Sequence, residues 1–310
     1  MKILAIETSH DDTSLALYEN KEVIWDQTIS QTDFHARFGG TIPEYAARNH
    51  AHNLSLMLNE LLVKHQLNAI DAIAYTSHPG LIGSLHMGKL FANGLSLSLN
   101  KPLYPINHLY GHIFAVEFTH KIKFPALALI VSGGHSQIWY VKSYNDLTLI
   151  GQTQDDALGE VYDKVARMLK LGFPGGPAID KLAKTYHGNL INFKINPLDQ
   201  FKLSFSGLKT KILNYVHKMN QKNQTINSAK IAASFQFYAI HYVLEIMQKA
   251  LKEFNPNSIV LGGGVAANSY LRTKFSELHP HSLLPALKHT TDNASMIAIT
   301  CDLQLNNQLF

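Results

Sequence analysis

Apolar runs bounded by polar or glycine-rich turns recur along the chain, and they predict alternating strands and helices. In the first half we expect strands at 2–7, 14–18, 22–29, 71–77 and 103–106, and helices from residue 43 towards 62 and over 84–99. In the second half we expect strands at 125–132, 136–141, 258–261 and 282–284, and helices at 156–170, 179–186, 228–254, 268–278 and 292–303. Each half therefore follows one order: strand, tight turn, strand, helices, then strand, loop, helix, strand.

This repeated order favours two similar α/β lobes, although two unrelated α/β domains would give the same pattern. We expect an N-terminal lobe of residues 1–106 plus 293–310 and a C-terminal lobe of residues 107–292 with a helical insertion. Open α/β sheets bind ligands at the loops that follow their strands. The loops after the predicted strands are therefore the first places to look for a site.

The composition narrows the class of protein. The 310 residues are 46% hydrophobic and only 16% charged, which predicts a folded core rather than disorder. The apolar run 126–131 is too short to span a bilayer, and Glu7 interrupts the N-terminus before a signal peptide could form. The single cysteine, Cys301, excludes an internal disulfide and a cysteine metal cage. These features predict a cytoplasmic protein with no membrane contact, and the net charge of +4 weakly favours an anionic partner.

Two histidines one helical turn apart, His108 and His112, could share one cation. However, 17 histidines in 310 residues give about one pair at this spacing by chance, so the spacing alone carries no information. Leu109 stands where a zincin metalloprotease needs a glutamate base. Asp292 is a candidate third ligand, because two histidines and a carboxylate suit Fe(II) or Zn(II); its other role would be to cap the last helix, as Thr291 also could.

Two glycine clusters follow predicted strands. Val131-Ser-Gly-Gly-His135 joins two apolar strands, and its amides could hold a phosphate or carboxylate, although an ordinary hairpin turn explains it equally well. Leu261-Gly-Gly-Gly-Val-Ala-Ala-Asn268 has more glycines than a turn needs, and Asn268 could hydrogen-bond an adenine or ribose there. Neither cluster is a Rossmann fingerprint or a P-loop.

Charged residues near the predicted loops have a possible chemical role and an ordinary one. Asp11 and Asp12 in the first turn could serve metal, phosphate or proton chemistry, or could lie in a solvated turn. Asp163 and Asp180 flank the run 174–177, which could fix a backbone beside a ligand or be a plain surface loop. The segment 201–211 mixes lysines with aromatics, as in nucleic-acid contacts and also in solvated amphipathic segments.

The order of these motifs is far more specific than any one of them. They are Ile-Glu-Thr-Ser-x-Asp-x-Thr (6–13), Pro-Gly-Leu-Ile-Gly (79–83), His-x-x-x-His (108–112), Val-Ser-Gly-Gly-His (131–135), Asp-Asp-Ala-x-Gly-Glu (155–160), Pro-Gly-Gly-Pro (174–177), Ser-Phe-Ser-Gly-Leu-Lys-Thr (204–210), Gly-Gly-Gly-Val-Ala-Ala-Asn (262–268) and Thr-Asp-Asn-Ala (291–294). Over residues 2–299 the chain closely resembles the TsaD/Gcp (YgjD/Kae/Qri) family of bacterial tRNA N6-adenosine threonylcarbamoyltransferases.

The resemblance implies an actin/Hsp70/sugar-kinase-like (ASKHA) α/β fold of two duplicated RNase H-like lobes around a central cleft. It implies one divalent metal, iron in the family with zinc as the alternative, at positions matching His108, His112 and Asp292. The positions that match the family's substrate-binding residues are Ile130, Val131, Ser132, Gly133, Gly134, Asp163, Gly176, Asp180 and Asn268. His10 and Asp12 depart from the cysteine and glutamate usual in the family, which affects only the first loop.

The reaction implied by the resemblance moves a threonylcarbamoyl group from threonylcarbamoyl-AMP to N6 of the adenosine beside the anticodon, in tRNAs that read codons beginning with A. The implied partners are tRNA, a TsaB-like subunit and a TsaE-like ATPase. Asp11 is our candidate for proton handling. Two other functions remain open: an ATPase or phosphotransferase of the same fold, and a non-catalytic assembly subunit. The residues give little support to an older label for the family, glycoprotein endopeptidase.

Overall fold

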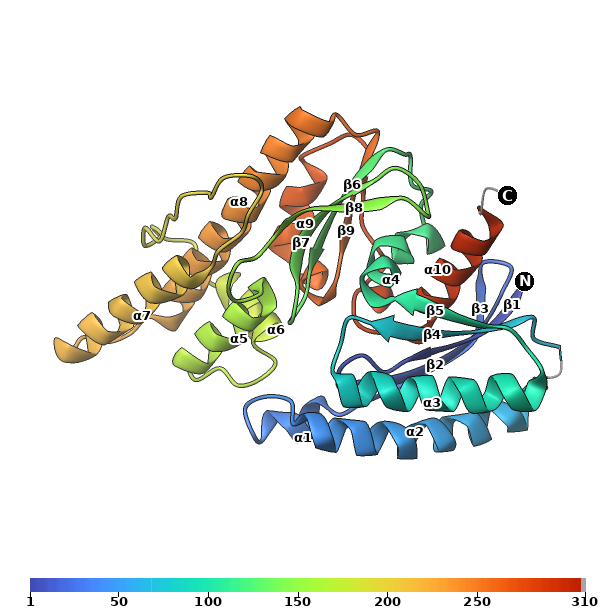
Figure 1. The fold of residues 1–310 in the computed structure, drawn as a ribbon. Helices are drawn as coiled ribbons and strands as arrows, with labels where there is room; N and C mark the ends of the chain where they lie inside the picture. Colours follow the sequence, from blue (N-terminus) through green and yellow to red (C-terminus); the bar gives the residue numbers. More distant parts are fainter. Residues whose placement is uncertain (68, 308–310) are drawn as a thin grey trace. The chain divides into compact units, whose positions relative to one another are not determined.

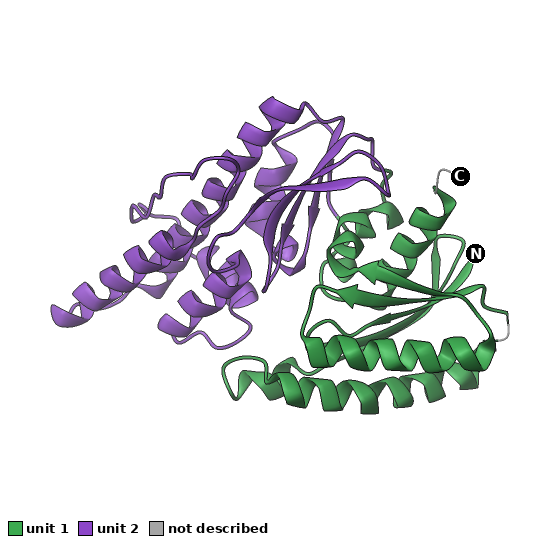
Figure 2. Cartoon of the chain, in the orientation of Figure 1, with its two compact units in different colours: residues 1–121, 285–310 green, residues 122–284 purple. Residues whose placement is uncertain are grey.

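The computed structural model describes residues 1–67 and 69–307, and these form two compact units (Figure 2). Unit 1 consists of Met1–Lys121 with Pro285–Phe310, and unit 2 is Ile122–Leu284. Both expected lobe boundaries, at 106/107 and 292/293, fall inside unit 1. The reason is that α4 (His108–Phe114) and η1 (Ala115–Phe118) pack against α10 (Ala294–Asn306) instead of starting the second unit. Residues 308–310 of the expected N-terminal lobe lie outside the described residues.

Unit 1 is built on a five-stranded sheet with the order β3-β2-β1-β4-β5. Its strands are β1 (Lys2–Glu7), β2 (Asp12–Glu19), β3 (Glu22–Ser30), β4 (Ala72–His78) and β5 (Leu103–Asn107). The first three strands are antiparallel, while β4 and β5 run parallel to β1. The carboxyl ends of β1, β4 and β5 therefore meet at one edge of the sheet, where the metal-site candidates of this unit follow.

Helices cover both faces of this sheet. On one face lie α2 (Pro43–Lys64) and α3 (Ile82–Leu99), and on the other lies α10, as Figure 1 shows. Strand β1 is consequently buried along almost its whole length, whereas the edge strand β3 alternates exposed and half-buried positions. The short helix α1 (Thr32–Ala36) and the turn η3 (Leu287–His289) complete the unit.

Unit 2 repeats the topology of unit 1. Its strands are β6 (Ala126–Val131), β7 (Ser136–Val141), β8 (Leu147–Gln152), β9 (Ser258–Gly262) and β10 (Ser282–Leu283), in the order β10-β9-β6-β7-β8. Again three antiparallel strands are followed by two parallel ones. The two units share one strand order, which supports the expectation of duplicated lobes over that of two unrelated domains.

The core of unit 2 consists of apolar side chains from its sheet and its helices, with β6, β9 and α8 among the contributors. The helices are α5 (Leu158–Met168), α6 (Gly175–Ala183), α7 (Ser206–Gln221), α8 (Ser228–Phe254) and α9 (Ser269–Ser276), with the turn η2 (Gly264–Ala267). Helix α8 confirms the helix expected at residues 228–254. None of the helices among the described residues combines the length and the apolar character needed to cross a bilayer.

Among the α-helices and strands of the described residues, four were not predicted from the sequence: α1, α4, β8 and α7. The short 3₁₀ helices η1, η2 and η3 were not predicted either. The strand β8 is a mostly exposed edge strand, so no buried apolar run marks it. Helix α7 falls partly on the lysine and aromatic segment 201–211, in which the apolar periodicity is diluted by lysines. Helix α4 is only seven residues long, which is shorter than the window in which a helical period can be detected.

Candidate functional site

The two histidines lie on α4, which begins directly after β5. Asn107 caps this helix, because its Oδ1 accepts hydrogen bonds from the backbone N–H groups of Leu109 and Tyr110 at 2.8 and 3.3 Å. This cap fixes His108 in the first turn and His112 one turn later, with both side chains buried. Their ring centroids are 4.7 Å apart and nearly perpendicular, so the rings share one face of the helix.

Asp292 completes a cluster with these histidines. Its Oδ1 lies 3.1 Å from Nε2 of His112 and 3.6 Å from Nε2 of His108. One ligand atom from each residue lies within 4.8 Å of the other two, which is the separation that three ligands of one ion require. All three residues belong to unit 1, although the expected boundaries placed them in the C-terminal lobe.

Asp292 is free to join the histidines because it does not cap α10. The cap is Asn293, whose Oδ1 accepts a hydrogen bond of 2.9 Å from the N–H of Met296. The expectation that Thr291 or Asp292 caps this helix was therefore wrong. Gly111 brings α4 close to α10, since a Cβ there would lie 3.0 Å from Cγ of Met296. This close packing fixes the distance between the histidines and Asp292.

The donor set fits a divalent metal ion. His112 is fully buried, and its Nδ1 makes no hydrogen bond within the described part of the chain, while its Nε2 has only the carboxylate of Asp292 beside it. A buried imidazole with so few polar partners is costly unless one of its nitrogens binds a ligand. Two imidazoles and a carboxylate are the ligands of mononuclear Fe(II) and Zn(II) sites that keep open positions for a substrate.

Glu7, at the end of β1, holds His108 in the orientation that metal binding needs. Nδ1 of His108 donates to Oε2 of Glu7 at 3.0 Å, and Nε2 therefore faces Asp292 as the nitrogen that can ligate a metal. The carboxylate is itself fixed by the hydroxyl of Thr76 and by the N–H of Ser9. A carboxylate behind a ligating histidine fixes its tautomer and raises its basicity. Glu7 was not among the functional residues predicted from the sequence. The feature that could have indicated it is a carboxylate at the carboxyl end of a buried strand.

The charges around the three residues favour a cation. Burial alone would lower the pKa of His108, but the carboxylates of Glu7 and Asp292 raise it to about 9. Burial would likewise raise the pKa of Asp292, but the neighbouring His108 holds it well below its usual range. The buried carboxylate of Glu7 and the half-buried carboxylate of Asp292 thus lie on either side of His108, and the site attracts positive charge.

The first loop, which carries Asp11 and Asp12, lies in the same unit. Nδ1 of His10 is 2.6 Å from Oδ1 of Asp11, so the residue that departs from the family pairs with our candidate for proton handling. Asp12 opens β2, and burial raises its pKa to about 7. Its Oδ1 is buried and accepts no hydrogen bond from the described residues. Asp12 is therefore a second candidate for proton transfer, beside Asp11.

The loop 79–83 packs directly on this first loop. A Cβ on Gly80 would lie 2.5 Å from the carbonyl oxygen of Ser9, and the N–H of Leu81 donates to the same oxygen at 2.8 Å. Two motifs that are about 70 residues apart in the sequence are thus in contact, as the carboxyl ends of the parallel strands β1 and β4 require.

In unit 2 the two glycine clusters also lie together. Gly263, at a φ of +88°, sits against the carbonyl of Val131, which would be 2.4 Å from an added Cβ. Gly159 at the start of α5 donates its N–H to the carbonyl of Ser132 at 3.1 Å. The exposed Gly133 and Gly134 have open space where a side chain would stand. Backbone amides at this strand end are therefore open to a ligand.

The remaining expected substrate residues of unit 2 form one network around α5, α6 and α9. Oδ1 of Asp163 accepts the N–H of Gly175, next to Gly176, at 2.7 Å. Oδ1 of Asp180 accepts the hydroxyl of Ser269 at 2.9 Å. Asn268 caps α9 and donates from Nδ2 to Gln236 at 2.7 Å. The side chain of Asn268 thus has protein partners here, in contrast to the free hydrogen-bonding group expected from the sequence.

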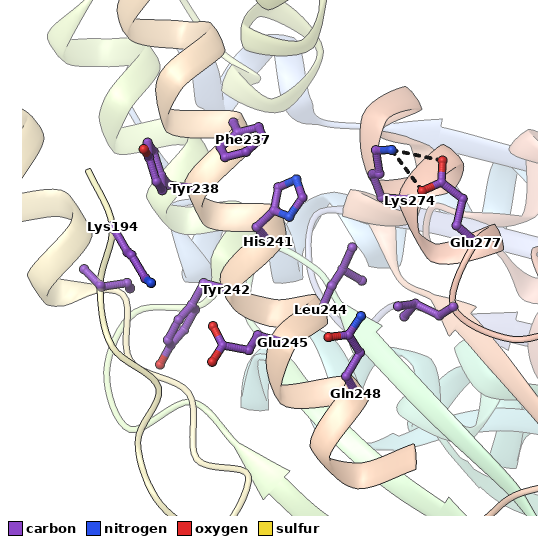
Figure 3. Close-up of a pocket in the computed structure, with 12 residues that line it drawn as sticks. Lys194, Phe237, Tyr238, His241, Tyr242, Leu244, Glu245, Gln248, Lys274 and Glu277 are labelled. Carbon is purple, nitrogen blue, oxygen red and sulfur yellow. Dashed lines mark hydrogen bonds and ion pairs between the residues drawn. The ribbon is translucent and has the colours of Figure 1, made fainter. Parts of the chain in front are cut away.

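A separate pocket of about 520 Å³ lies between α8, α9 and the segment around Lys194 (Figure 3). Its lining includes Phe237, Tyr238 and His241 together with the ion pair of Lys274 and Glu277. It contains none of the expected substrate-binding residues. We therefore locate the candidate site at the strand-end loops and not in this pocket.

Two α/β units of one topology, one of them with a His₂-carboxylate cluster at its parallel-strand edge, define a two-lobed α/β protein of the ASKHA class with a candidate metal centre. Solved structures of this class are similar over nearly the whole chain. HypF from T. kodakarensis matches with a TM-score of 0.69 and 14% identity over 98% of this chain and 48% of that one. Component A of (R)-2-hydroxyglutaryl-CoA dehydratase from Acidaminococcus fermentans matches with a TM-score of 0.55 and 14% identity over 96% of each chain.

Sequence comparisons are more specific. The family profile described as TsaD, tRNA N6-adenosine threonylcarbamoyltransferase, matches residues 22–299. The proteins of that name from Mycoplasmopsis agalactiae and Mycoplasma mobile are 50% and 51% identical to this chain, over 98% and 99% of it and 99% of each relative. The chain belongs to the TsaD family of tRNA N6-adenosine threonylcarbamoyltransferases.

Proposed function

We propose that this protein transfers the threonylcarbamoyl group of threonylcarbamoyl-AMP to N6 of the adenosine beside the tRNA anticodon, at a site that uses one divalent metal, iron or zinc. The observation that carries this proposal is the cluster of His108, His112 and Asp292, supported behind His108 by Glu7. A non-catalytic assembly subunit would not need two buried histidines whose Nε2 atoms converge on one carboxylate.

His108, His112 and Asp292 would hold the metal. When bound, it would supply a Lewis acid for the oxygens of the threonylcarbamoyl group or its phosphate. Glu7 keeps Nδ1 of His108 protonated, so that Nε2 is the ligating atom. The close packing of α4 on α10 at Gly111 keeps the two histidines and Asp292 at a fixed separation. The contribution of the chain at this site is positioning, which matters because the exocyclic amine of adenine is a poor nucleophile.

The substrate-binding part of the proposal concerns the loops of unit 2. The backbone from Ile130 to Gly134 would bind the acyl phosphate end of the adenylate, and Gly176 would offer its backbone beside it. Exposed amides at Gly133 and Gly134, with no side chain to obstruct them, support this role. Asp163, Asp180 and Asn268 support the same loops through their hydrogen bonds to Gly175, Ser269 and Gln236. An adenylate contact of Asn268 would require it to exchange the bond to Gln236.

The attacking amine has to lose a proton. Asp11 remains our candidate to receive it, and its pairing with His10 orients its carboxylate. Asp12 is the alternative within the same loop, because burial raises its pKa to about 7 and so lets it bind and release a proton near neutral pH.

We also propose that a TsaB-like subunit docks on the outer face of α2 and α3, and that a TsaE-like ATPase joins the assembly. Ile82, Leu90 and Leu97 lie on one side of α3 and are 75%, 63% and 84% exposed, and Val63 at the end of α2 is 84% exposed. Apolar side chains gathered on a neighbouring pair of helices mark an interaction surface. Replacing Leu90 and Leu97 with lysine should abolish co-purification with that subunit and leave the metal content unchanged.

The direct test is to incubate the protein with threonylcarbamoyl-AMP and unmodified tRNA, with and without the partner subunits, and to analyse the digested nucleosides. We expect threonylcarbamoyladenosine in the tRNA and AMP as the released product. Phosphoryl transfer from ATP to a small molecule, with no modified nucleoside, would instead support the phosphotransferase alternative. No reaction of either kind in the presence of all partners would support an assembly subunit.

A further inference from the structure

Positive charge is concentrated in one segment of unit 2. Residues 184–244 contain eight lysines and a single carboxylate, Asp199, and so carry a net charge of +7. The rest of the chain carries a net charge of −3, because the whole chain is +4. Although the net charge of the whole chain is moderate, this segment is strongly basic. It comprises α7, the first part of α8 and the loop before α7.

Helix α7 arranges three of these lysines in a line. Leu208, Ile212 and Val216 are buried and face the core of unit 2. Lys211, Lys218 and Lys222 follow at intervals of seven and four residues and are exposed. With about 100° of turn per residue, they fall within roughly 40° of one another on one flank of the helix. We call these three residues the lysine stripe. Lys211 and Lys218 lie on α7 and Lys222 directly follows it; Figure 1 shows this helix beside α8.

The stripe is not neutralised by the protein. Lys209, on the other flank of α7, forms an ion pair with Asp156, and Lys184 forms one with Asp180. No carboxylate of the described residues forms an ion pair with Lys211, Lys218 or Lys222. Lysines that form no ion pair and lie along one exposed flank suit a partner with a row of negative charges.

Lys194 extends the stripe beyond the helix. Nζ of Lys211 donates to the backbone carbonyl of Lys194 at 2.5 Å, which brings the two residues side by side. Lys194 is itself exposed, and Figure 3 shows its side chain at the edge of the pocket that contains Tyr238 and Tyr242. The basic surface therefore continues from α7 to a pocket whose lining combines aromatic side chains with the carboxylate of Glu245. Lysines next to aromatic side chains are a combination found where RNA is bound.

For two of the three lysines of the stripe, helix stability alone would explain their position. Lys218 and Lys222 lie in the last turn of α7 and just beyond it, where positive charge interacts favourably with the helix dipole. This explanation does not account for Lys211, which lies in the first half of the helix, or for Lys194, which is outside it. It also predicts an effect on helix stability only.

We infer that the lysine stripe, extended by Lys194, is the surface on which this protein binds the sugar-phosphate backbone of its tRNA substrate. This inference rests on the proposed function, which makes a polyanion the substrate. Lysine ammonium groups act as point charges towards phosphates and do not read bases, so the surface contributes affinity and orientation rather than sequence choice.

The test uses the full-length protein in the mixture that supports transfer, with unmodified tRNA transcript as the probe. The triple variant Lys211→Gln, Lys218→Gln and Lys222→Gln keeps helix-forming side chains while removing three charges. The matched control replaces Lys21, Lys121 and Lys252 with glutamine; these three are exposed and lie outside residues 184–244 and outside helices α2 and α3. Binding is measured across a series of salt concentrations, KM and kcat for transfer are measured separately, and circular dichroism checks folding.

We expect the stripe variant to bind tRNA more weakly and to lose roughly two to three units from the slope of log affinity against log salt, about one per phosphate contact. Its KM for tRNA should rise with kcat unchanged, while the control variant behaves as wild type. Unchanged affinity and slope in the stripe variant, with wild-type transfer intact, would overturn this inference and leave the proposed function standing. A wild-type protein that neither binds nor modifies tRNA would overturn both.

Discussion

His108 and Glu7 are joined by a hydrogen bond of 3.0 Å between Nδ1 and Oε2, although 101 residues separate them in the chain. The bond crosses from α4 to the end of β1 and is buried at both ends. Because Thr76 and Ser9 bind the same carboxylate, Glu7 has little freedom to move. The orientation of one proposed metal ligand is thus set by the central strand of the sheet.

The Glu7→Gln variant should bind metal more weakly. An amide at this position is a poorer acceptor for the His108 proton and leaves the imidazole less basic, and loss of such a partner costs 10- to 100-fold in metal affinity. Competition with a chelator of known affinity measures the change for Fe(II) and Zn(II). Glu19→Gln is the control, since the Glu19 side chain is 42% exposed at the end of β2. Equal affinities for wild type and Glu7→Gln would rule out this role for Glu7.

Replacing Gly263 should destabilise the protein, whereas replacing the adjacent Gly264 should not. It adopts φ +88° and ψ 165°, a conformation that essentially only glycine adopts, and a Cβ there would press on the carbonyl of Val131. We expect Gly263→Ala to lower the free energy of unfolding by at least about 1–3 kcal/mol in urea denaturation. Gly264→Ala has open space around the added methyl group and should unfold at nearly the wild-type midpoint. Similar midpoints for both variants would refute this explanation.

Asp12 should make the metal-free protein less stable as the pH rises. Burial raises the pKa of Asp12 to about 7 in the folded protein, whereas the carboxyl group of an unfolded chain titrates near 4. Between these values the folded state holds a proton that the unfolded chain has released, so stability falls with rising pH by up to about 1.4 kcal/mol per unit.

The Asp12→Asn variant lacks this proton, so it should gain stability relative to wild type from about pH 4 to pH 7 and show no further gain above about pH 8. Urea titrations of chelator-treated protein at several pH values measure the difference. Parallel pH profiles of the two proteins would show that Asp12 titrates normally.

The repeated order of strands and helices was predictable because buried strands such as β1 and β6 are continuous apolar runs. The strand β8 was not, since its exposed edge position leaves no such run. The boundary between the units was also misplaced. Whether α4 packs on α10 depends on the contact between Gly111 and Met296, and no local pattern in the sequence reports a contact between residues so far apart.

The candidate metal site was likewise predictable only in part. The spacing of His108 and His112 was uninformative in a chain with 17 histidines, and the position of Asp292 outside the cap of α10 depends on Asn293 taking that role. Motif order identified the three residues together, because it reflects the whole site rather than one pair. Glu7 was missed, since its role depends on where the side chain of His108 points in three dimensions.

The central claim is that threonylcarbamoyl transfer depends on a metal held by His108, His112 and Asp292. The most direct measurement compares freshly purified wild type with His112→Ala for metal content per chain and for modified nucleoside formed from threonylcarbamoyl-AMP and tRNA. We predict about one metal ion per wild-type chain, and in the variant a loss of metal and of transfer together. A variant that has lost its metal and still transfers at the wild-type rate would contradict the claim.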